Sequence, residues 1–420
     1  MNAGVIKLSH FSVKEYLAST RVEEYFSINE KTSHSMISKF LITYLLQFDD
    51  DSVPLTEAML EAMPLAQYAA EHWIVHVGSG DPKDLQLILN LLVTGSAPLT
   101  NSIRIFDIDR WSWNYSDFKN LSMDRAEVCS ALYYSSLAGM KEVSDCLLQK
   151  GENANAKGGF HGNALQAASY SGNVAIVELL LVNGAEVNAE GGNYGNALQS
   201  ASDRGNEAIV KLLLVNGADV NVDGGNALQA ACYKGNEAIV KLLLENGAEL
   251  NAEGGNFGTA LQAASHSGNV TIVKLLLVNG VDVNADGGNA LQAASHSGNV
   301  AIAKLLLVSG AEVNAKGGNC GSALQAASCS GNLNEAIVKL LLENGADVNA
   351  EGGHFGNALQ AASYSGNETI VKLLLKNGAE VNAVGGEYGN ALQAALYGGK
   401  EAIVKLLLEN GAEMISEGGE

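Results

Sequence analysis

Residues 196–225 read NALQSASDRGNEAIVKLLLVNGADVNVDGG, and this stretch decides the fold because close copies of it fill most of the chain. Each copy begins with the tetrad Asn-Ala-Leu-Gln or a near variant, and successive tetrads are 33, 30, 33, 30, 33, 35 and 33 residues apart. A weaker copy, Ser130-Ala-Leu-Tyr133, lies 33 residues upstream of the first full tetrad. Self-similarity at such a period predicts a stacked array of nine repeats. The leucines of the full tetrads are Leu165, Leu198, Leu228, Leu261, Leu291, Leu324, Leu359 and Leu392.

The quoted stretch predicts two short helices joined by a tight turn. Asn196 is a favourable N-cap for the first helix, because its side-chain oxygen can accept from the unpaired amides of the first turn. Gly205 ends that helix, since glycine adopts the left-handed conformation without steric cost. Asn206 then caps a second helix over residues 207–215, which Gly217 ends.

The second helix is apolar on nearly all sides. Residues 208–214 read AIVKLLL, with Lys211 as the charged residue among them. A helix of this kind needs cover from several neighbours, and burial of each leucine contributes about 1.5 to 3 kcal/mol. One helical pair cannot supply that cover, so we expect each unit to be stabilised by stacking between two others.

Units of different length differ in their loops. The 30-residue units lack three residues between a glycine pair and the tetrad, as a comparison of residues 191–196 with residues 224–226 shows. The 35-residue unit has two extra residues, for which Leu333-Asn334 in the turn between its helices is the natural position. Changes of length confined to loops are what a stacked array tolerates.

Composition and charge exclude several classes of protein. A content of 47% hydrophobic and 17% charged residues argues against a disordered chain. The formal net charge of -21 offers no basic face for nucleic acid and would be repelled by an anionic membrane. Five cysteines without a CxxC pair, and a start without a signal peptide, favour a reducing compartment. We therefore expect no nucleic-acid partner, no membrane partner and a cytoplasmic protein, with a nuclear location as the alternative.

The repeated unit resembles the ankyrin repeat. A 33-residue helix-turn-helix unit that ends in Gly-Ala-Asp/Glu-Val-Asn-Ala, as at residues 345–350, is typical of that family, and the resemblance covers about residues 126–415. It implies an all-α ankyrin-repeat solenoid of about nine helix-turn-helix units after a mainly helical N-terminal region. It also implies hairpin-like finger loops, which are the glycine-rich loops before each first helix. The predicted domains are residues 1–125, an ankyrin repeat domain over residues 126–415 and a tail over residues 416–420.

The tetrad departs from the family pattern. Where ankyrin repeats usually carry Thr-Pro-Leu-His, this chain carries Asn163-Ala-Leu-Gln166, Thr259-Ala-Leu-Gln262 or Ser322-Ala-Leu-Gln325. Loss of the proline removes a preset backbone angle, and loss of the histidine removes a ring nitrogen that can bond neighbouring backbone. The cap residue and the core leucine remain, so this departure predicts less stable individual repeats within the same fold.

The N-terminal region carries a second resemblance. Residues 8–17 (LSHFSVKEYL), 40–46 (FLITYLL) and 64–73 (PLAQYAAEHW) are similar to the segment between the NACHT NTPase and the ankyrin repeats of fungal NLR-like proteins. The 420 residues contain no GxxxxGK[ST] loop, so they cannot build the phosphate cradle of such an NTPase. The resemblance implies either a fragment or an NTPase-less regulator of a signalling receptor.

No combination of residues predicts an enzyme, a cofactor or a metal site. No GxSxG, HExxH or paired-carboxylate motif occurs in a suitable setting, and glycine-rich turns such as residues 191–195 recur in most repeats without a preceding buried strand. His266, His296 and Cys329 hold equivalent positions in successive repeats. Packed neighbouring helices lie about 8 to 10 Å apart, which is too far for two such side chains to share a zinc ion. We therefore predict a non-catalytic protein without cofactor or metal ion.

Two series of positions vary between units that are otherwise nearly identical: the end of each first helix and the finger loop. In ankyrin repeats these places line the concave face that holds a partner, and tyrosine suits a protein partner. The alternatives are drift at exposed sites and finger aromatics that pack on the next finger. We predict an aromatic and acidic face that binds a protein of basic or mixed charge. Its partner-binding residues are Phe160, Tyr170, Tyr194, Asp203, Tyr233, Phe257, His266, His296, Phe355, Tyr364, Tyr388 and Tyr397, with Cys320 and Cys329 as the cysteines of the two series.

The last second helix is as apolar as the interior ones. It covers residues 402–408, and residues 409–420 are all that follows it in the sequence. No polar capping repeat covers it, so we expect this end to be exposed and either to fray or to self-associate. Leu407→Glu is the substitution that this expectation suggests as a test.

Overall fold

The computed structural model describes residues 30–50, 54–79, 85–109, 120–222, 226–254, 258–285, 289–318, 320–330 and 334–414. These residues hold 23 α-helices, labelled α2 to α24, one short 3-10 helix and no β-strand beyond isolated bridges. The predicted all-α class is therefore confirmed. Contacts between Cα atoms divide the chain into two compact units, Met1–Ser200 and Ala201–Glu420, which are described separately.

The first unit begins with helices that precede the repeats. α2 packs along α4, α5 contacts α2, and α6 contacts α4. Ile42, Leu45 and Trp73 are buried among them. The predicted helical N-terminal region is confirmed over residues 40–45 and 66–73, whereas residues 8–17 lie outside the described residues. The bounds are α2 (Glu30–Leu45), α3 (Glu57–Ala62), α4 (Ala66–Ser79), α5 (Leu85–Leu91) and α6 (Ala97–Ile105).

A buried aspartate joins this region to the first repeats of the unit. Asp109 Oδ1 accepts a hydrogen bond from Tyr133 Oη at 2.5 Å, and its Oδ2 accepts from Phe160 N at 2.5 Å. Burial and the Asp109 carboxylate raise the pKa of Tyr133, so its hydroxyl stays a donor. Ala131 N also donates to Thr94 Oγ1 at 2.8 Å. The segment before residue 110 thus packs on the first repeat, a point that the sequence left open.

Nine helical pairs follow, as predicted. α7 and α8 form the first pair, and α11 contains the division between the two units. The pairs are α7 (Ala131–Leu137) and α8 (Lys141–Gln149), α9 (Ala164–Ser171) and α10 (Val174–Val182), α11 (Ala197–Arg204) and α12 (Glu207–Val215), α13 (Asn226–Lys234) and α14 (Glu237–Glu245), α15 (Ala260–Ser267) and α16 (Val270–Val278), α17 (Asn289–His296) and α18 (Val300–Val308), α19 (Ala323–Cys329) and α20 (Glu335–Glu343), α21 (Ala358–Ser365) and α22 (Glu368–Lys376), and α23 (Ala391–Tyr397) and α24 (Glu401–Glu409).

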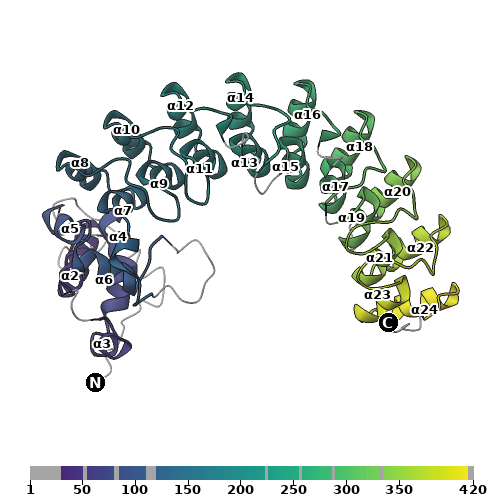
Figure 1. Ribbon diagram of the computed structural model, residues 1–420, viewed down its shortest axis with the longest axis horizontal. Helices are drawn as coiled ribbons and strands as arrows, with labels where there is room; N and C mark the ends of the chain where they lie inside the picture. The colour runs from purple at the N-terminus through teal and green to yellow at the C-terminus, as the bar shows by residue number, and fades with distance from the viewer. Residues whose placement is uncertain are drawn as a thin grey trace, which may run out of the picture. The chain divides into compact units, whose positions relative to one another are not determined.

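The second unit has two helical layers (Figure 1). The first helices α13 to α23 contact one another in order, and the second helices α14 to α24 do the same. The finger loops extend beyond the first-helix layer, on the side away from the second helices. Three of them close with an isolated antiparallel bridge, for example Gly352 with Gly356, which confirms their hairpin-like form. None of the described helices in either unit combines the length and apolar character needed to cross a bilayer.

The second helices from α8 to α22 each bury the same three positions. In α12 these are Ile209, Val210 and Leu213, and α12 itself has the predicted bounds. Val215 at its end is 85% exposed. The side of α12 that carries these three residues is therefore buried against the rest of the array, while its outer side faces solvent.

The capping prediction is right for the first helix and wrong for the second. Asn196 Oδ1 accepts from Gln199 N at 2.8 Å, as expected of an N-cap. Asn206 holds the N-cap position of α12, but its side chain makes no cap hydrogen bond. The equivalent Asn236 makes none either, and its Nδ2 instead donates to Ser202 O of the preceding repeat at 3.3 Å. Asn269, at the same position of a later repeat, does both: its Oδ1 accepts from Ile272 N at 3.0 Å and its Nδ2 donates to Gly235 O of the preceding repeat at 3.3 Å.

The tetrad glutamine joins each repeat to the next finger. Gln360 Nε2 donates to the carbonyl oxygens of Ala383, Gly385 and Gly389 at 3.3, 3.1 and 2.7 Å. The same triple contact is made by Gln166 and Gln325. The glutamine amide therefore bonds neighbouring backbone at the tetrad position where the family carries a histidine, and the lower stability of individual repeats stays a prediction.

The glutamine fits because a finger glycine leaves room for it. Gly356 has a φ of +89°, and a Cβ atom there would overlap Gln360 Oε1. Any side chain at this position would collide with the amide and would also strain the backbone. The position of the tetrad glutamine thus requires a glycine in the finger loop before it.

Asparagines in the loops after the second helices make a further connection. Asn349 Nδ2 donates to Gly378 O at 3.1 Å, and its Oδ1 accepts from Glu380 N at 2.8 Å. Asn155, Asn221, Asn284, Asn314 and Asn382 make the same pair of bonds to the following repeat. Each repeat therefore satisfies backbone groups of its neighbour as well as its own.

The longest unit differs in the turn between its helices, as predicted. Residues 330–334 join α19 to α20, where residues 297–299 suffice between α17 and α18. The assignment of Asn334 as an inserted residue is wrong, because it takes the N-cap position that Asn299 holds in the preceding repeat. Its Nδ2 donates to Ser295 O at 3.0 Å. The extra residues fall within 331–333, outside the described residues.

The last second helix is only partly exposed. α24 buries Ile403 and Leu407, whereas Leu408 is 53% exposed. The expectation of an exposed end is therefore right for Leu408 and wrong for Leu407, which packs toward the interior. The predicted tail, residues 416–420, lies outside the described residues.

Candidate functional site

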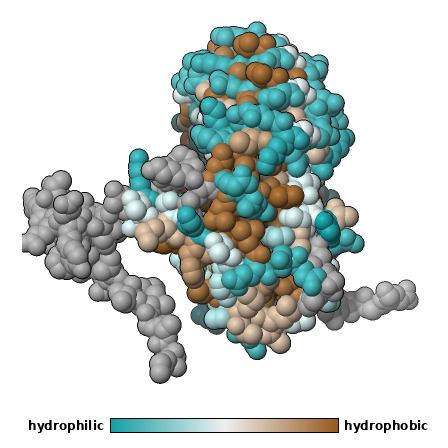
Figure 2. All heavy atoms as spheres, turned by 90° about the vertical axis from the view of Figure 1, so that its left-hand side faces the viewer, coloured by the Kyte–Doolittle hydropathy of each residue, from teal (hydrophilic) through white to brown (hydrophobic). Residues whose placement is uncertain are grey.

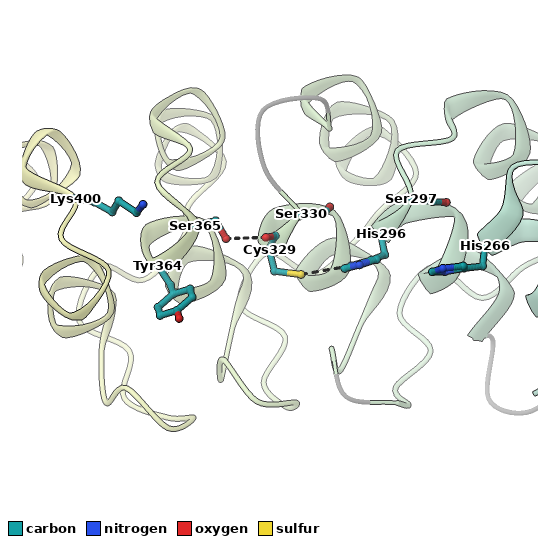
Figure 3. Close-up of a pocket in the computed structure, with 8 residues that line it drawn as sticks. All are labelled: His266, His296, Ser297, Cys329, Ser330, Tyr364, Ser365 and Lys400. Carbon is teal, nitrogen blue, oxygen red and sulfur yellow. Dashed lines mark hydrogen bonds between the residues drawn. The ribbon is translucent and has the colours of Figure 1, made fainter. Parts of the chain in front are cut away.

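The second unit carries an open groove of about 700 Å³ along the ends of its first helices. Figure 3 shows its lining side chains in a row that crosses successive repeats. Four of them, His266, His296, Cys329 and Tyr364, belong to the predicted first-helix series. The complete lining is His266, His296, Ser297, Cys329, Ser330, Tyr364, Ser365 and Lys400.

The repeat geometry explains this row. Every first helix begins at the same tetrad and has nearly the same length, so its last residue falls at the same place in each repeat. The rings of Tyr233 and His266 stack at 5.8 Å between centroids, and those of His266 and His296 at 6.4 Å. His296 Nδ1 then lies 3.7 Å from Cys329 Sγ. Residues that are distant in the sequence thereby form one continuous surface.

Serine side chains near the ends of the first helices donate hydrogen bonds to backbone carbonyl groups of the preceding first helix. Ser365 Oγ donates to Cys329 O at 2.8 Å, and Ser267 Oγ donates to Cys232 O at 3.2 Å. Each of these bonds crosses from one first helix to the preceding one. The ends of the first helices are therefore held in register, which gives the variable side chains a rigid support.

The groove is not acidic. Its lining, drawn from the described residues, includes Lys400 and no carboxylate, so the predicted acidic character is wrong for this part of the surface. Carboxylates lie instead at the starts of second helices, where Glu368 pairs with Lys372 at 2.5 Å. An acidic residue there also suits the helix dipole.

Three predicted residues form an aromatic cluster in the first unit. Tyr170 and Tyr194 are 5.2 Å apart between ring centroids, and Phe160 and Tyr194 are 6.2 Å apart. The buried ring of His161 contacts Tyr170 at 4.2 Å and lies 3.8 Å from Asp109. Finger aromatics here pack on the next finger, which was the structural alternative to a binding role.

Four predicted residues form a second cluster near the C-terminal end of the groove. Tyr388 contacts Tyr364 at 4.8 Å, Tyr397 at 4.9 Å and Phe355 at 6.1 Å. Desolvation and a hydrogen bond with Tyr364 raise the pKa of Tyr388 to about 12. Tyr397 remains largely exposed. Because Tyr364 belongs to both features, this cluster continues the groove.

The remaining predicted residues are placed as follows. Asp203 Oδ1 lies 3.5 Å from Lys234 Nζ, so Asp203 forms an ion pair with a lysine of the next repeat. Tyr233 begins the stacked row with His266. Phe257 lies outside the described residues. The structure therefore gathers the predicted series into clusters, and it does not itself test whether they bind a partner.

The place of Lys400 in the groove and the approach of Cys320 to Cys329 were not predicted from the sequence. A hydrogen bond between the two thiols lowers the pKa of Cys320 to about 7 and raises the pKa of Cys329. Cys320, Cys329 and His296 bring their Sγ and ring nitrogen atoms within 4.8 Å of one another. One signal was available: a cysteine replaces the finger aromatic in the same repeat whose first helix ends in cysteine.

The repeat array is similar to known proteins from residue 165 onward. A family model described as ankyrin repeats matches residues 165–254, 253–317 and 323–417. The azaphilone pigments biosynthesis cluster protein L of Monascus ruber is 36% identical over 180 residues, which cover 39% of this chain and 37% of that protein. The chain thus spans well under half the length of that relative. The crystal structure of the human ASB11 ankyrin repeat domain is similar at 28% identity and a TM-score of 0.45, over 51% of this chain and 97% of that chain.

Proposed function

The chain belongs to the ankyrin-repeat family, and we propose that it is a non-catalytic protein-binding module that holds a protein partner along the groove of its second unit. Ankyrin repeats imply protein–protein interaction. The observation that carries the proposal is the pattern of variation: His266, His296, Cys329 and Tyr364 differ at one position of the repeat and come together in an open groove. The second helices behind them repeat nearly unchanged.

The groove suits a polar segment that also carries an apolar side chain. Two histidine rings and Tyr364 offer flat surface together with hydrogen-bonding atoms, and Lys400 supplies one positive charge. Such amphipathic side chains bury a large area at a low cost in rotamer entropy. A few of them near the centre of an interface commonly account for most of the binding energy.

A paired capture experiment tests this proposal. The full chain with His266→Ala and Tyr364→Ala should bind its partner at least about 10-fold more weakly, because the two rings are expected to be central contacts. The matched control is Lys211→Ala with Lys241→Ala, which removes two exposed side chains of second helices. Equal partner recovery by the groove variant and the control would rule out the groove as the binding surface.

A receptor arm is the second candidate, and exposed apolar side chains of the N-terminal helices favour it. Met36 and Phe40 of α2 are exposed, as are Tyr68 and Val75 of α4. Figure 2, which faces the side of the first unit, shows hydrophobic side chains gathered in a patch bordered by hydrophilic surface. We propose that these helices couple the repeats to a further domain, in line with the resemblance to NACHT-ankyrin proteins. Genomic DNA upstream of Met1 decides this: an in-frame P-loop domain supports the receptor arm, and its absence contradicts a fragment.

A further inference from the structure

We propose that His296, Cys320 and Cys329 bind one zinc ion at the edge of the groove. Their ligand atoms all lie within 4.8 Å of one another. Figure 3 shows His296 and Cys329 pointing toward each other from α17 and α19, with Nδ1 and Sγ 3.7 Å apart. This site is separate from the proposed partner-binding function and adds an ion-binding function to the same surface.

The distances fit tetrahedral coordination. Zinc lies about 2.3 Å from a thiolate sulfur and about 2.0 to 2.1 Å from an imidazole nitrogen, so two such ligands on one ion are about 3.6 Å apart. The observed separation of 3.7 Å between His296 Nδ1 and Cys329 Sγ is close to that value. Cys320 Sγ, within 4.8 Å of both, needs only a small side-chain adjustment to complete a three-ligand set.

The donor set selects a thiophilic metal. Two sulfurs and one imidazole nitrogen suit zinc and disfavour magnesium or calcium, which prefer oxygen ligands. Cys320 and Cys329 are both free thiols. Three protein ligands leave a fourth tetrahedral position for water or for a side chain of a bound partner, as in open zinc sites.

The expectation that the spacing of packed helices excludes a shared metal ion is wrong. The helices lie about 8 to 10 Å apart, yet the side chains of His296 and Cys329 extend toward each other and bring Nδ1 and Sγ to 3.7 Å. The third ligand, Cys320, comes from a finger loop. That finger is closed by a hydrogen bond from Gly317 N to Gly321 O at 2.9 Å, which places Cys320 over the end of its own first helix. Two ligands thus come from one repeat, and His296 alone comes from the preceding one.

The neighbouring repeat shows what the cysteines replace. At the equivalent positions it carries Phe355 and Tyr364, whose rings pack at 5.4 Å between centroids. Aromatic rings join the finger to the first helix there. Two cysteine side chains are too small to make the same contact, and a shared zinc ion would join the two segments in their place.

Metal titration of the full chain, kept reduced with a phosphine, tests the site. Zinc should bind once per chain with a Kd on the order of 1 μM, weaker than a four-ligand structural site. Cobalt(II) should give the charge-transfer absorption of a thiolate-bound ion and the visible bands of tetrahedral geometry. Cys320→Ser, Cys329→Ser and His296→Gln should each weaken zinc binding at least about 100-fold, since each removes a direct ligand.

Two variants serve as matched controls. Cys146→Ser removes a half-buried thiol of α8, and His266→Gln removes the ring next to His296 without removing a ligand. Both should bind zinc like the wild-type chain, and circular dichroism should show equal helix content in all variants. Absence of zinc binding by the reduced wild-type chain would overturn the proposal. A disulfide between Cys320 and Cys329 that forms in air would not change that conclusion. Unchanged binding by Cys320→Ser would overturn the proposal as well.

Discussion

The two helical layers of the second unit differ in what they allow to vary. From α12 to α22, every second helix buries an isoleucine, a valine or alanine, and a leucine at the same places, for example Ile272, Val273 and Leu276 in α16. The first helices repeat their buried tetrad leucine but end in different residues, such as His266 and Tyr364. Positions that stack repeats are therefore fixed, and variation concentrates where side chains meet solvent in the groove.

The largest expected effect comes from the second-helix layer. Leu276→Ala should lower the free energy of unfolding by about 2 to 5 kcal/mol, because the side chain is fully buried and its loss leaves a cavity. Urea unfolding followed by circular dichroism measures the change. Val278→Ala is the control, since Val278 is 86% exposed and its truncation should change stability by less than about 0.5 kcal/mol. Equal changes in stability at the two positions would show that Leu276 is not packed in the interior of the array.

A smaller effect is expected where the layers meet the finger loops. Gln360→Ala should cost about 1 to 3 kcal/mol, because carbonyl groups of the next finger lose their donor. Gln393→Ala in the last tetrad is the control: its Oε1 accepts from Asn390 N within its own repeat. Thermal unfolding of the two variants should therefore differ, with the larger loss at Gln360. The same loss in both would mean that the inter-repeat bonds contribute little.

The smallest expected effect concerns the end of the second-helix layer. Leu407 is buried, so Leu407→Glu would unfold the last repeat whether or not the chain self-associates. The exposed Leu408 is the better position, and Leu408→Glu should weaken self-association about 10-fold, or about 1.4 kcal/mol. Analytical ultracentrifugation measures the change, and self-association stays a prediction until then. A wild-type chain that is monomeric at all concentrations would contradict it.

Periodicity predicted most of the fold. The tetrad spacing gave the nine repeats, and the apolar run with its flanking glycines gave α12 its bounds, because both depend on local residues. The bonds of Asn236 and Gln360 to other repeats were not predicted, because sequence alone does not show which neighbour a side chain reaches. Asp109 went unnoticed because it lies outside the repeats and its partners follow tens of residues later.

The candidate site was predictable in part. The first-helix series followed from comparing equivalent positions, and four of its members line the groove. The charge of the groove could not be derived from the net charge, since carboxylates such as Glu368 pair with lysines on the other layer. The approach of Cys320 to Cys329 depends on the folding of a finger loop over a helix end, which periodicity does not describe.

The most direct test of the two-layer account measures stability and partner binding on the same variants. His266→Ala with Tyr364→Ala should weaken binding at least about 10-fold. It should lower the free energy of unfolding by less than Leu276→Ala does, because His266 is exposed and Tyr364 is only half-buried, so neither truncation leaves a closed cavity. The account is contradicted if this variant keeps its affinity for the partner, or if it loses as much stability as Leu276→Ala.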